Sequence, residues 1–336
     1  MVTIKDVAEK AGVNPSTVSR TLKDSPSISQ ATKERVRKAM DDLGYVPNLA
    51  AQTLASGQTQ SIGVILPPLM NQERLSQPFF MQIITAINAE ASRLSLTVSI
   101  AAGENVTAIQ EQVQLMHRQK RADGFILLYA EEGDPVKDYL VNNALPFVMV
   151  GAPQDEKEEI PYVDNDNVSL GQAALNYLYQ HGHKEIAFVT DDRQGKVFQR
   201  RYQGYKEASK HLGLPIFAPV LFDRKNPASL QDFTDLLEGS HISALIVSDD
   251  LTAVQIMQWL SFYHLKVPDD YSIISFNNST YANIIHPYLS SFDIQIEELG
   301  KASLHLLIDR LKTKKLPPLY SEVPFLLMER ESVLKK

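Results

Sequence analysis

The sequence of residues 3–22, TIKDVAEKAGVNPSTVSRTL, predicts two short helices joined by a tight turn. Thr3 is placed to cap the first helix, and Gly12 is placed to end it. Asn14 is placed to cap the second helix, and Pro15 takes its first helical position, where a missing N–H is tolerated. The apolar side chains of both helices share one face, which leaves a short polar face carrying one arginine.

A third helix is expected over residues 30–43, between a Ser29 cap and Gly44. Its basic side chains are expected on the outside: Lys33, Arg35, Arg37 and Lys38. Two helices at a steep angle around a glycine-bearing turn form a helix-turn-helix, whose second helix can enter the DNA major groove. A small helical hairpin with no role in DNA binding would show the same caps and spacing.

Two runs, VTIKDVAEKAGVNPSTVSRTL (2–22) and RVRKAMDDLGYVPNLAAQTLASG (35–57), resemble the headpiece and hinge of the lactose/galactose repressor (LacI/GalR) family of bacterial transcription regulators. The resemblance puts the base-reading positions at Pro15, Ser16 and Arg20. Proline can make only apolar contact, whereas Arg20 can bind the O6 and N7 atoms of a guanine. The DNA-contacting residues implied are Thr3, Asn14, Pro15, Ser16, Thr17, Ser19, Arg20, Thr32, Asn48 and Leu54.

The hinge helix and linker are expected at residues 47–60, after a headpiece of residues 1–46. A helix capped by Asn48 would be much shorter than the roughly 12–15 residues that are stable alone in water. In the resembling family this helix pairs with its twin from a second subunit and presses a leucine, here Leu54, into the minor groove. The alternative is a plain tether with Leu54 docked on the body.

Composition separates the headpiece from the rest of the 336-residue chain. The first 60 residues hold eight Lys and Arg against six Asp and Glu, a net charge of +2, so the chain's total of −7 leaves −9 for the rest. A weakly basic head on an acidic body suits a protein that touches DNA at one end. The chain has no cysteine, which excludes disulfides, thiolate metal sites and thiol nucleophiles.

Several classes of protein are disfavoured. The first residues, MVTIKDVAEK, lack an apolar signal core, and no apolar run approaches the roughly twenty residues of a membrane span, so we expect a cytoplasmic protein without a membrane partner. Neither GxGxxG after a strand, GxxxxGK nor GxSxG occurs, and we expect no enzyme activity. A solute-binding transport protein would share the body, but the headpiece and the missing signal core oppose it.

From Ser61 onward, seven apolar runs alternate with helical segments: SIGVILP, LTVSIAAG, DGFILLY, PFVMVG, EIAFVTD, ALIVSDD and YSIISFN. Such alternation predicts parallel sheets with right-handed crossovers. Seven strands are too many for one compact sheet. The resemblance implies a periplasmic-binding-protein-like body with an N-subdomain at 61–162, a return segment at about 290–325 and a C-subdomain at 163–289.

The expected fold is therefore multi-domain. An all-α helix-turn-helix headpiece plus hinge helix precedes an α/β body of two parallel-sheet subdomains. Ligands of such sheets bind beyond the carboxyl ends of the strands, and a cleft between the subdomains is the natural effector site.

The resemblance places three polar effector-binding residues at these strand ends. Arg201 can grip two hydroxyls or a carboxylate, although a surface arginine is the alternative. Asp249 can accept bonds from sugar hydroxyls, while Asp250 is expected to cap the next helix. Asn277 stands where the family has an acidic residue, and a turn role for the Asn277-Asn278 pair is the competing interpretation.

Three aromatic candidates complete the predicted effector site: Phe79, Phe80 and Phe222. Aromatic faces stack on sugar rings and on purines alike, and core packing is the alternative for each. The pair His181 and His183 has no further ligands, and the 164–167 segment lacks a calcium-loop pattern, so no metal and no cofactor are expected.

The sequence thus predicts a homodimeric transcription repressor of sugar-utilisation genes, resembling the maltose-operon subgroup, on a pseudo-palindromic operator. A sugar such as maltose in the cleft would release the DNA. A purine or phosphosugar acting as co-repressor remains the alternative, ahead of a sugar-binding protein or an enzyme acting on glycosides.

Overall fold

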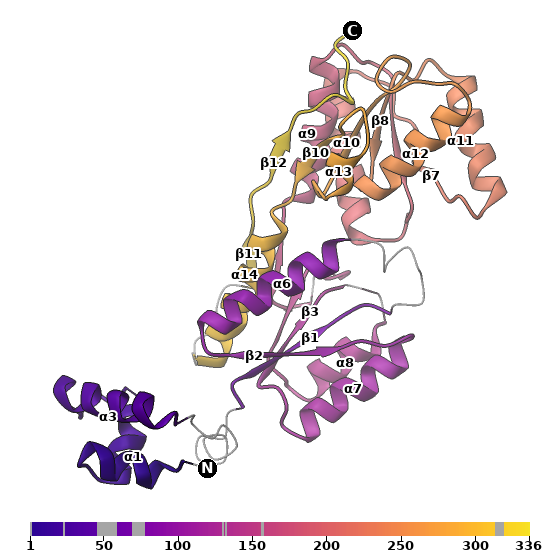
Figure 1. Ribbon diagram of the computed structural model, residues 1–336. Helices are drawn as coiled ribbons and strands as arrows, with labels where there is room; N and C mark the ends of the chain where they lie inside the picture. Colours follow the sequence, from indigo (N-terminus) through magenta and orange to yellow (C-terminus); the bar gives the residue numbers. More distant parts are fainter. Residues whose placement is uncertain are drawn as a thin grey trace. The chain divides into compact units, whose positions relative to one another are not determined.

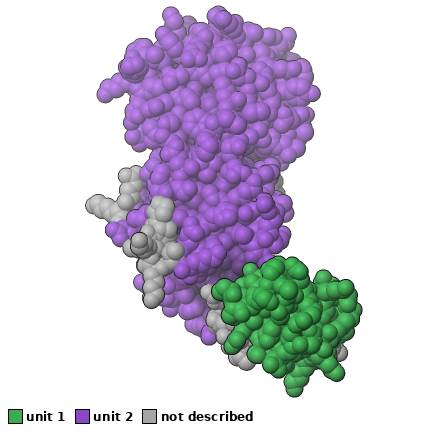
Figure 2. Space-filling model, turned by 90° about the vertical axis from the view of Figure 1, so that its left-hand side faces the viewer, with its two compact units in different colours: residues 1–59 green, residues 60–336 purple. Residues whose placement is uncertain are grey.

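The computed structural model describes residues 2–22, 24–45, 59–68, 78–129, 131, 133–155, 158–312 and 319–336. These residues belong to two compact units, within residues 1–59 and 60–336, which Figure 2 distinguishes by colour. The predicted hinge, with Asn48 and Leu54, lies outside the described residues. No helix in the described ranges has both the length and the apolar character needed to cross a membrane.

The headpiece consists of the three predicted helices, α1 (Ile4–Ala11), α2 (Pro15–Leu22) and α3 (Gln30–Leu43). Val7, Val18 and Val36 are fully buried where the three helices meet. Gly12 and Gly44 end α1 and α3 with a φ of 61°, the left-handed conformation that glycine adopts without strain. The capping signals therefore predicted the ends of α1 and α3 correctly.

The body contains two sheets and the helices that cover them. The first sheet and its helices comprise β1 (Ser61–Ile65), α6 (Pro78–Arg93), β2 (Thr97–Ala101), α7 (Val106–Arg118), β3 (Gly124–Leu127), α8 (Pro135–Asn142), β4 (Phe147–Val150), β5 (Tyr162–Asp164), α14 (Ile296–Lys312) and β11 (Tyr320–Glu322). The second comprises α9 (Asn167–Gln180), β6 (Ile186–Thr190), α10 (Lys196–Leu212), β7 (Val220–Leu221), α11 (Pro227–Gly239), β8 (Ala244–Val247), α12 (Asp250–Phe262), β9 (Ser272–Phe276), α13 (Tyr281–Ile284), β10 (Ser290–Asp293) and β12 (Leu326–Met328).

Both sheets are built on parallel strands. The first has the order β11-β5-β4-β3-β1-β2, and β1 pairs with β2 from Ser61 opposite Thr97 to Ile65 opposite Ala101. Helices α7 and α8 cover one face of this sheet, and α6 and α14 cover the other (Figure 1). Burial on both faces explains why its central strands are continuous apolar runs rather than alternating ones.

The second sheet has the order β12-β10-β9-β8-β6-β7, with only β12 antiparallel to its neighbour. Helices α9 and α10 pack on one face, and α11 and α12 pack on the other. All seven apolar runs identified in the sequence are strands, β1, β2, β3, β4, β6, β8 and β9. The predicted architecture of two parallel-sheet subdomains is confirmed.

The boundaries between the subdomains differ from the expected ones at 162/163 and 289/290. Strand β5 lies wholly in the first sheet, so the chain crosses after Asp164. The polar strand β10 pairs in parallel with β9 of the second sheet, so the return begins with α14. After β11 the chain crosses a third time to add β12. A short, polar or half-exposed strand carries no apolar run, so the sequence pattern did not distinguish these strands from loops.

One buried side chain joins the three crossings. The Asn165 side-chain amide donates to the carbonyl oxygen of Ile294 at 3.0 Å and to that of Val323 at 2.8 Å. Asn165 itself lies on the first crossing, and the two carbonyls lie on the second and third. The three connections between the subdomains are therefore held together by hydrogen bonds of the Asn165 side chain.

Candidate functional site

The outward face of α2 carries the residues predicted to read DNA. Asn14, Pro15, Ser16 and Arg20 are exposed, whereas Val18 on the opposite side is fully buried. The other two residues predicted on this face, Thr17 and Ser19, are partly exposed. Within the described residues, the Arg20 side chain makes no hydrogen bond or ion pair, so its guanidinium is available to a ligand.

Thr3 and Thr32 lie at the N-terminal ends of α1 and α3. The Asp6 carboxylate accepts hydrogen bonds from the Thr3 backbone N–H at 2.7 Å and from its hydroxyl at 2.8 Å. The Thr32 backbone N–H donates to the Ser29 hydroxyl at 3.4 Å. The backbone N–H groups of both threonines are thus already paired at the helix N-termini, with Asp6 in α1 and with Ser29 in α3.

The prediction that Lys33 points outward is wrong. Its ammonium group contacts the Asp24 backbone carbonyl at 3.0 Å and the Asp24 carboxylate at 2.9 Å, and only 8% of the residue is exposed. Arg37 pairs with the same carboxylate at 3.1 Å. Lys33, ahead of Arg37, holds the pKa of Asp24 below its ordinary value. Of the four basic side chains expected on the outside of α3, Arg35 and Lys38 are exposed and form no such ion pair with the described residues.

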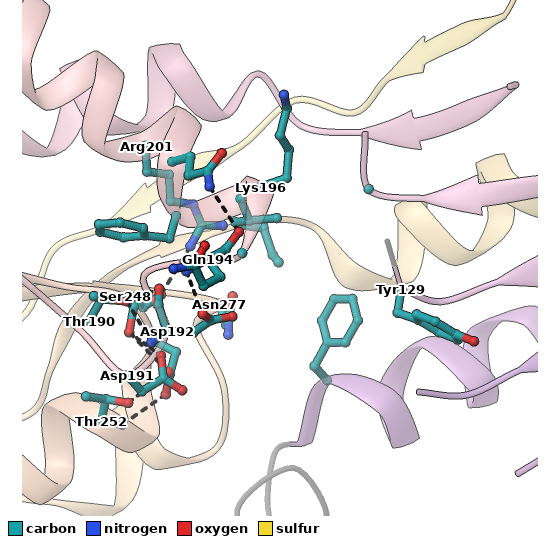
Figure 3. Close-up of a pocket in the computed structure, with 18 of the residues that line it drawn as sticks. Tyr129, Thr190, Asp191, Asp192, Gln194, Lys196, Arg201, Ser248, Thr252 and Asn277 are labelled. Carbon is teal, nitrogen blue, oxygen red and sulfur yellow. Dashed lines mark hydrogen bonds between the residues drawn. The ribbon is translucent and has the colours of Figure 1, made fainter. Parts of the chain in front are cut away.

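A cavity of about 830 Å³ lies between the two sheets of the body, beyond the carboxyl ends of their strands. All six residues predicted to bind the effector line it: Phe79, Phe80, Arg201, Phe222, Asp249 and Asn277. In Figure 3, Asp191, Ser248 and Thr252 lie together on the side of the second sheet, and Tyr129 lies across the open space. The tertiary structure thus brings together residues that are far apart in the sequence.

Arg201, in the first turns of α10, is the most constrained of these residues. Its Nε donates to Asn167 Oδ1 at 2.9 Å, its Nη1 donates to the Ser248 carbonyl at 3.2 Å, and its guanidinium lies 4.2 Å from the ring centre of Phe276. Burial lowers the pKa of Arg201 to about 10, which still leaves it protonated at neutral pH. Only 5% of the residue is exposed, so it is not a surface arginine.

The roles expected of Asp249 and Asp250 are partly reversed. Asp249 is the N-cap of α12, and its carboxylate accepts from the Thr252 N–H and hydroxyl, both at 2.9 Å. Asp250 turns into the protein, where the hydroxyls of Ser275 and Ser291 donate to it. Asp249 still lines the cavity, because a capping side chain at a strand end lies on the cavity surface. Burial raises the pKa of both carboxyls.

Asp191, which the sequence analysis missed, follows β6 and faces Asp249 across the Ser248 hydroxyl. That hydroxyl lies 3.0 Å from Asp191 Oδ1 and 3.4 Å from Asp249 Oδ2. The surrounding protein, followed by the Asp249 charge, raises the pKa of Asp191 to about 6, although solvent still reaches its side chain through the cavity. Its position after an apolar strand is the signal that could have identified it.

The Asn277-Asn278 pair forms a turn and also contributes to the cavity. Both residues have a positive φ, 99° and 49°, which asparagine tolerates better than most residues. The side chain of Asn278 contacts Asp293 and Arg330, whereas that of Asn277 makes no hydrogen bond within the described ranges. Asn277 therefore presents a donor and an acceptor to the cavity.

The aromatic candidates are not equivalent. Phe79 and Phe80, at the start of α6, are partly exposed and meet edge to face with ring centres 5.3 Å apart. Phe222 is only 2% exposed and packs against Phe233, with ring centres 5.1 Å apart. Tyr129, which follows β3, is a further aromatic side chain in the lining. Phe222 serves chiefly the core, whereas Phe79 and Phe80 can cover a ligand.

The charge of the lining is negative. Six carboxylates contribute to it, Glu131, Asp164, Asp191, Asp192, Asp223 and Asp249, against three cations, Lys196, Arg201 and Arg224. Among the residues that the structure describes, no group of three His, Asp or Glu side chains could hold a metal ion. The cavity can thus offer hydrogen-bond acceptors and aromatic faces to a ligand.

Comparisons with known proteins agree with this organisation. Residues 3–48 match the family of bacterial regulatory proteins of the lacI type, and residues 175–333 match a periplasmic binding protein-like domain. The HTH-type transcriptional regulator MalR of Streptococcus pneumoniae is 35% identical over 94% of this chain and 94% of its own.

Two solved structures are similar over nearly the whole chain. A complex of the transcriptional regulator CelR with cellobiose has a TM-score of 0.74 and 27% identity, covering 99% of this chain and 100% of that one. The lac repressor dimer bound to operator and the anti-inducer ONPF has a TM-score of 0.76 and 25% identity, covering 99% of both chains. These similarities extend through headpiece and body alike. The chain therefore belongs to the lacI family of bacterial regulatory proteins, which are DNA-binding transcription regulators and not enzymes.

Proposed function

We propose that this regulator is a cytoplasmic homodimeric repressor of sugar-utilisation genes, released from its operator by a neutral disaccharide such as maltose. The relative named MalR and the CelR complex with cellobiose favour a sugar effector. The lac repressor dimer on its operator favours a homodimer on a pseudo-palindromic site.

The lining of the cavity is the observation that carries the sugar assignment. The second subdomain presents Asp191, Asp249 and Asn277 as hydrogen-bond partners for hydroxyls, and the first presents Phe79, Phe80 and Tyr129. A sugar ring has both an apolar face and a polar edge, which matches these two sides. The volume of about 830 Å³ accommodates a molecule of more than one ring.

Charge argues against a phosphorylated effector. A phosphate group would enter a lining in which carboxylates outnumber cations by six to three. Like charges at close range disfavour binding, and more so away from bulk water. A neutral ligand avoids this repulsion.

In the headpiece, α2 is assigned to the major groove, with Arg20 reading a guanine and Pro15 making apolar contact. Asn14, Ser16, Thr17 and Ser19 would support these contacts. Thr3 and Thr32 keep the DNA contacts implied by the family. Asn48 and Leu54 keep the roles implied by the family in the hinge.

The experiment that tests this proposal is operator binding by fluorescence anisotropy, with DNA from upstream of the protein's own gene and its neighbours. The panel contains maltose, cellobiose, glucose 6-phosphate and guanine. Release of the DNA by a neutral disaccharide and by neither of the last two is the expected result. Release by the phosphosugar, or tightening by guanine, would overturn the effector assignment and leave the family assignment intact.

A further inference from the structure

A hydrogen-bonded path runs beneath the cavity from the first sheet to the second. The Ala152 N–H donates to Asp164 Oδ2 at 3.0 Å, and Asn167 Nδ2 donates to Asp164 Oδ1 at 3.0 Å. Arg201 then connects Asn167 Oδ1, at 2.9 Å, to the Ser248 carbonyl, at 3.2 Å. Ala152 and Ser248, at the two ends of the path, both line the cavity.

The Asn167 side chain is the one link whose chemistry suits both neighbours. Asp164, when ionised, can only accept, and Arg201 can only donate, so the residue between them must supply a donor and an acceptor. A primary amide does so, and Asn167 is 1% exposed, which leaves water little access as a substitute. Leaving either neighbour unpaired in this buried place would be costly.

Two glycines fix the helices that carry Asn167 and Arg201. A Cβ atom on Gly171 of α9 would lie 1.9 Å from the Arg201 carbonyl oxygen, and one on Gly204 of α10 would lie 1.9 Å from the Val168 carbonyl oxygen. The two helices therefore touch through their backbones. The backbone of Arg201 is thus packed directly on α9, and the Asn167 amide connects its guanidinium to Asp164 of the first sheet.

We propose that Asn167 is a positioning residue that holds the Arg201 guanidinium and ties it to Asp164, so that a ligand engaging Arg201 acts on the angle between the two sheets. The path lies beside Asn165, where the three crossings between the sheets are tied together. A displacement of Arg201 would therefore act close to the three chain crossings that connect the two sheets. This inference rests on the proposed function only for the identity of the ligand.

A test without ligand uses the absence of cysteine in the chain. Spin labels at Arg118→Cys in α7 and Lys210→Cys in α10, both exposed positions, report the distance between the subdomains. Labelled protein is diluted with unlabelled protein so that only distances within one chain are read. Asn167→Ala is expected to broaden or shift the distance distribution. The control, Tyr202→Phe, loses a 2.8 Å bond to the Phe217 carbonyl inside the second subdomain and should leave the distribution unchanged.

A second arm uses maltose and separates the two bonds of the amide. Asn167→Ala is expected to weaken maltose binding about ten- to hundredfold, because Arg201 loses an acceptor. Asn167→Asp keeps that acceptor, and once its carboxylate and that of Asp164 are both ionised, which repeating the measurement at higher pH secures, it loses the donor to Asp164. It should therefore bind maltose within about threefold of the wild type while showing the altered distance distribution and a weaker release of operator.

The outcomes distinguish this inference from the proposed function. A wild-type protein that binds no sugar of the panel would refute the sugar assignment, while the ligand-free distances would still decide the role of Asn167. Wild-type distances in both variants would overturn the inference. So would equal losses of maltose affinity in both variants. If Asn167→Ala does not fold, Asn167→Asp decides alone.

Discussion

The headpiece and the body of this protein present their candidate binding residues in opposite ways. In α2, Arg20 and its neighbours are exposed and make few contacts with the rest of the protein. In the body, Arg201 and Asp249 are buried and already hydrogen-bonded. The difference follows from the ligands proposed for them. DNA is a large surface that is met from outside, whereas a small molecule is enclosed.

This contrast has energetic consequences. An exposed arginine must lose side-chain freedom when it binds, whereas a prearranged one has lost that freedom during folding. Variants of the headpiece should therefore change DNA discrimination with little effect on stability. Variants of buried, hydrogen-bonded residues in the body should change both the free energy of unfolding and the affinity for the effector. A residue that contributes to only one of these properties should change only that one.

The most buried of the three aromatic residues predicted to bind the effector should serve stability rather than binding. Phe222→Ala is expected to lower the free energy of unfolding by about 3–5 kcal/mol, because it removes a buried ring packed against Phe233. Urea unfolding followed by tryptophan fluorescence measures this loss. Phe79→Ala is the contrast, with a stability loss of about 1 kcal/mol and weaker maltose binding. A larger stability loss for Phe79→Ala than for Phe222→Ala would break the distinction.

Arg201→Ala should remove effector binding while sparing the headpiece. We expect maltose affinity to fall at least about thirtyfold, measured by calorimetry, while the exposed DNA-contacting residues of the headpiece are unchanged. Arg201→Lys should not restore binding, because a lysine cannot bond Asn167 and Ser248 in the same fork. The matched control is Arg200→Ala, whose side chain does not line the cavity. Full maltose affinity in Arg201→Ala would refute the assignment.

Arg20→Ala should change base discrimination without changing effector binding. The expected loss is about 1–3 kcal/mol of preference at one base pair of each half-site, measured by selection from randomised operators. Arg35→Ala on α3, also an exposed arginine, should at most weaken binding to all sequences alike. An unchanged sequence preference in Arg20→Ala would move base reading to other residues of α2.

The smallest effect concerns Asp191 and pH. Its pKa is raised from 3.8 to about 6, so between these values the folded protein holds a proton that the unfolded chain has released. Stability therefore falls as pH rises through this window, and Asp191→Asn removes that fall. In thermal unfolding, the stability of the variant relative to the wild type should increase as the pH rises to about 6. Above that pH the difference in stability should stay constant. A difference that does not vary with pH in this window would contradict the prediction.

Sequence reasoning was most successful where structure is local. The caps and glycines around α1, α2 and α3 act within a few residues of the chain, and buried parallel strands are apolar throughout, so both could be read directly. It did not predict strands β10 and β12, because their pairing depends on distant strands. It also misplaced Lys33, whose ion pair with Asp24 forms only when the helices of the headpiece pack together. A basic side chain on a helix gives no sign of such a partner.

The candidate cavity shows the same division. Its six predicted residues came from the family resemblance and from the ends of strands, and the structure places them together around one space. The sequence did not reveal which of two adjacent aspartates caps α12, that Asp191 faces Asp249, or that Asn167 stands between Asp164 and Arg201.

The helices of the headpiece, the alternation of strands and helices, and the identity of the side chains at the strand ends follow from the amino-acid sequence. The burial of those side chains and their bonding partners follow only from the packing of the folded chain. Capping and periodicity act over a few residues. Hydrogen bonds such as those of Asn165 to Ile294 and Val323 join segments more than a hundred residues apart, and exist only once the two sheets are assembled.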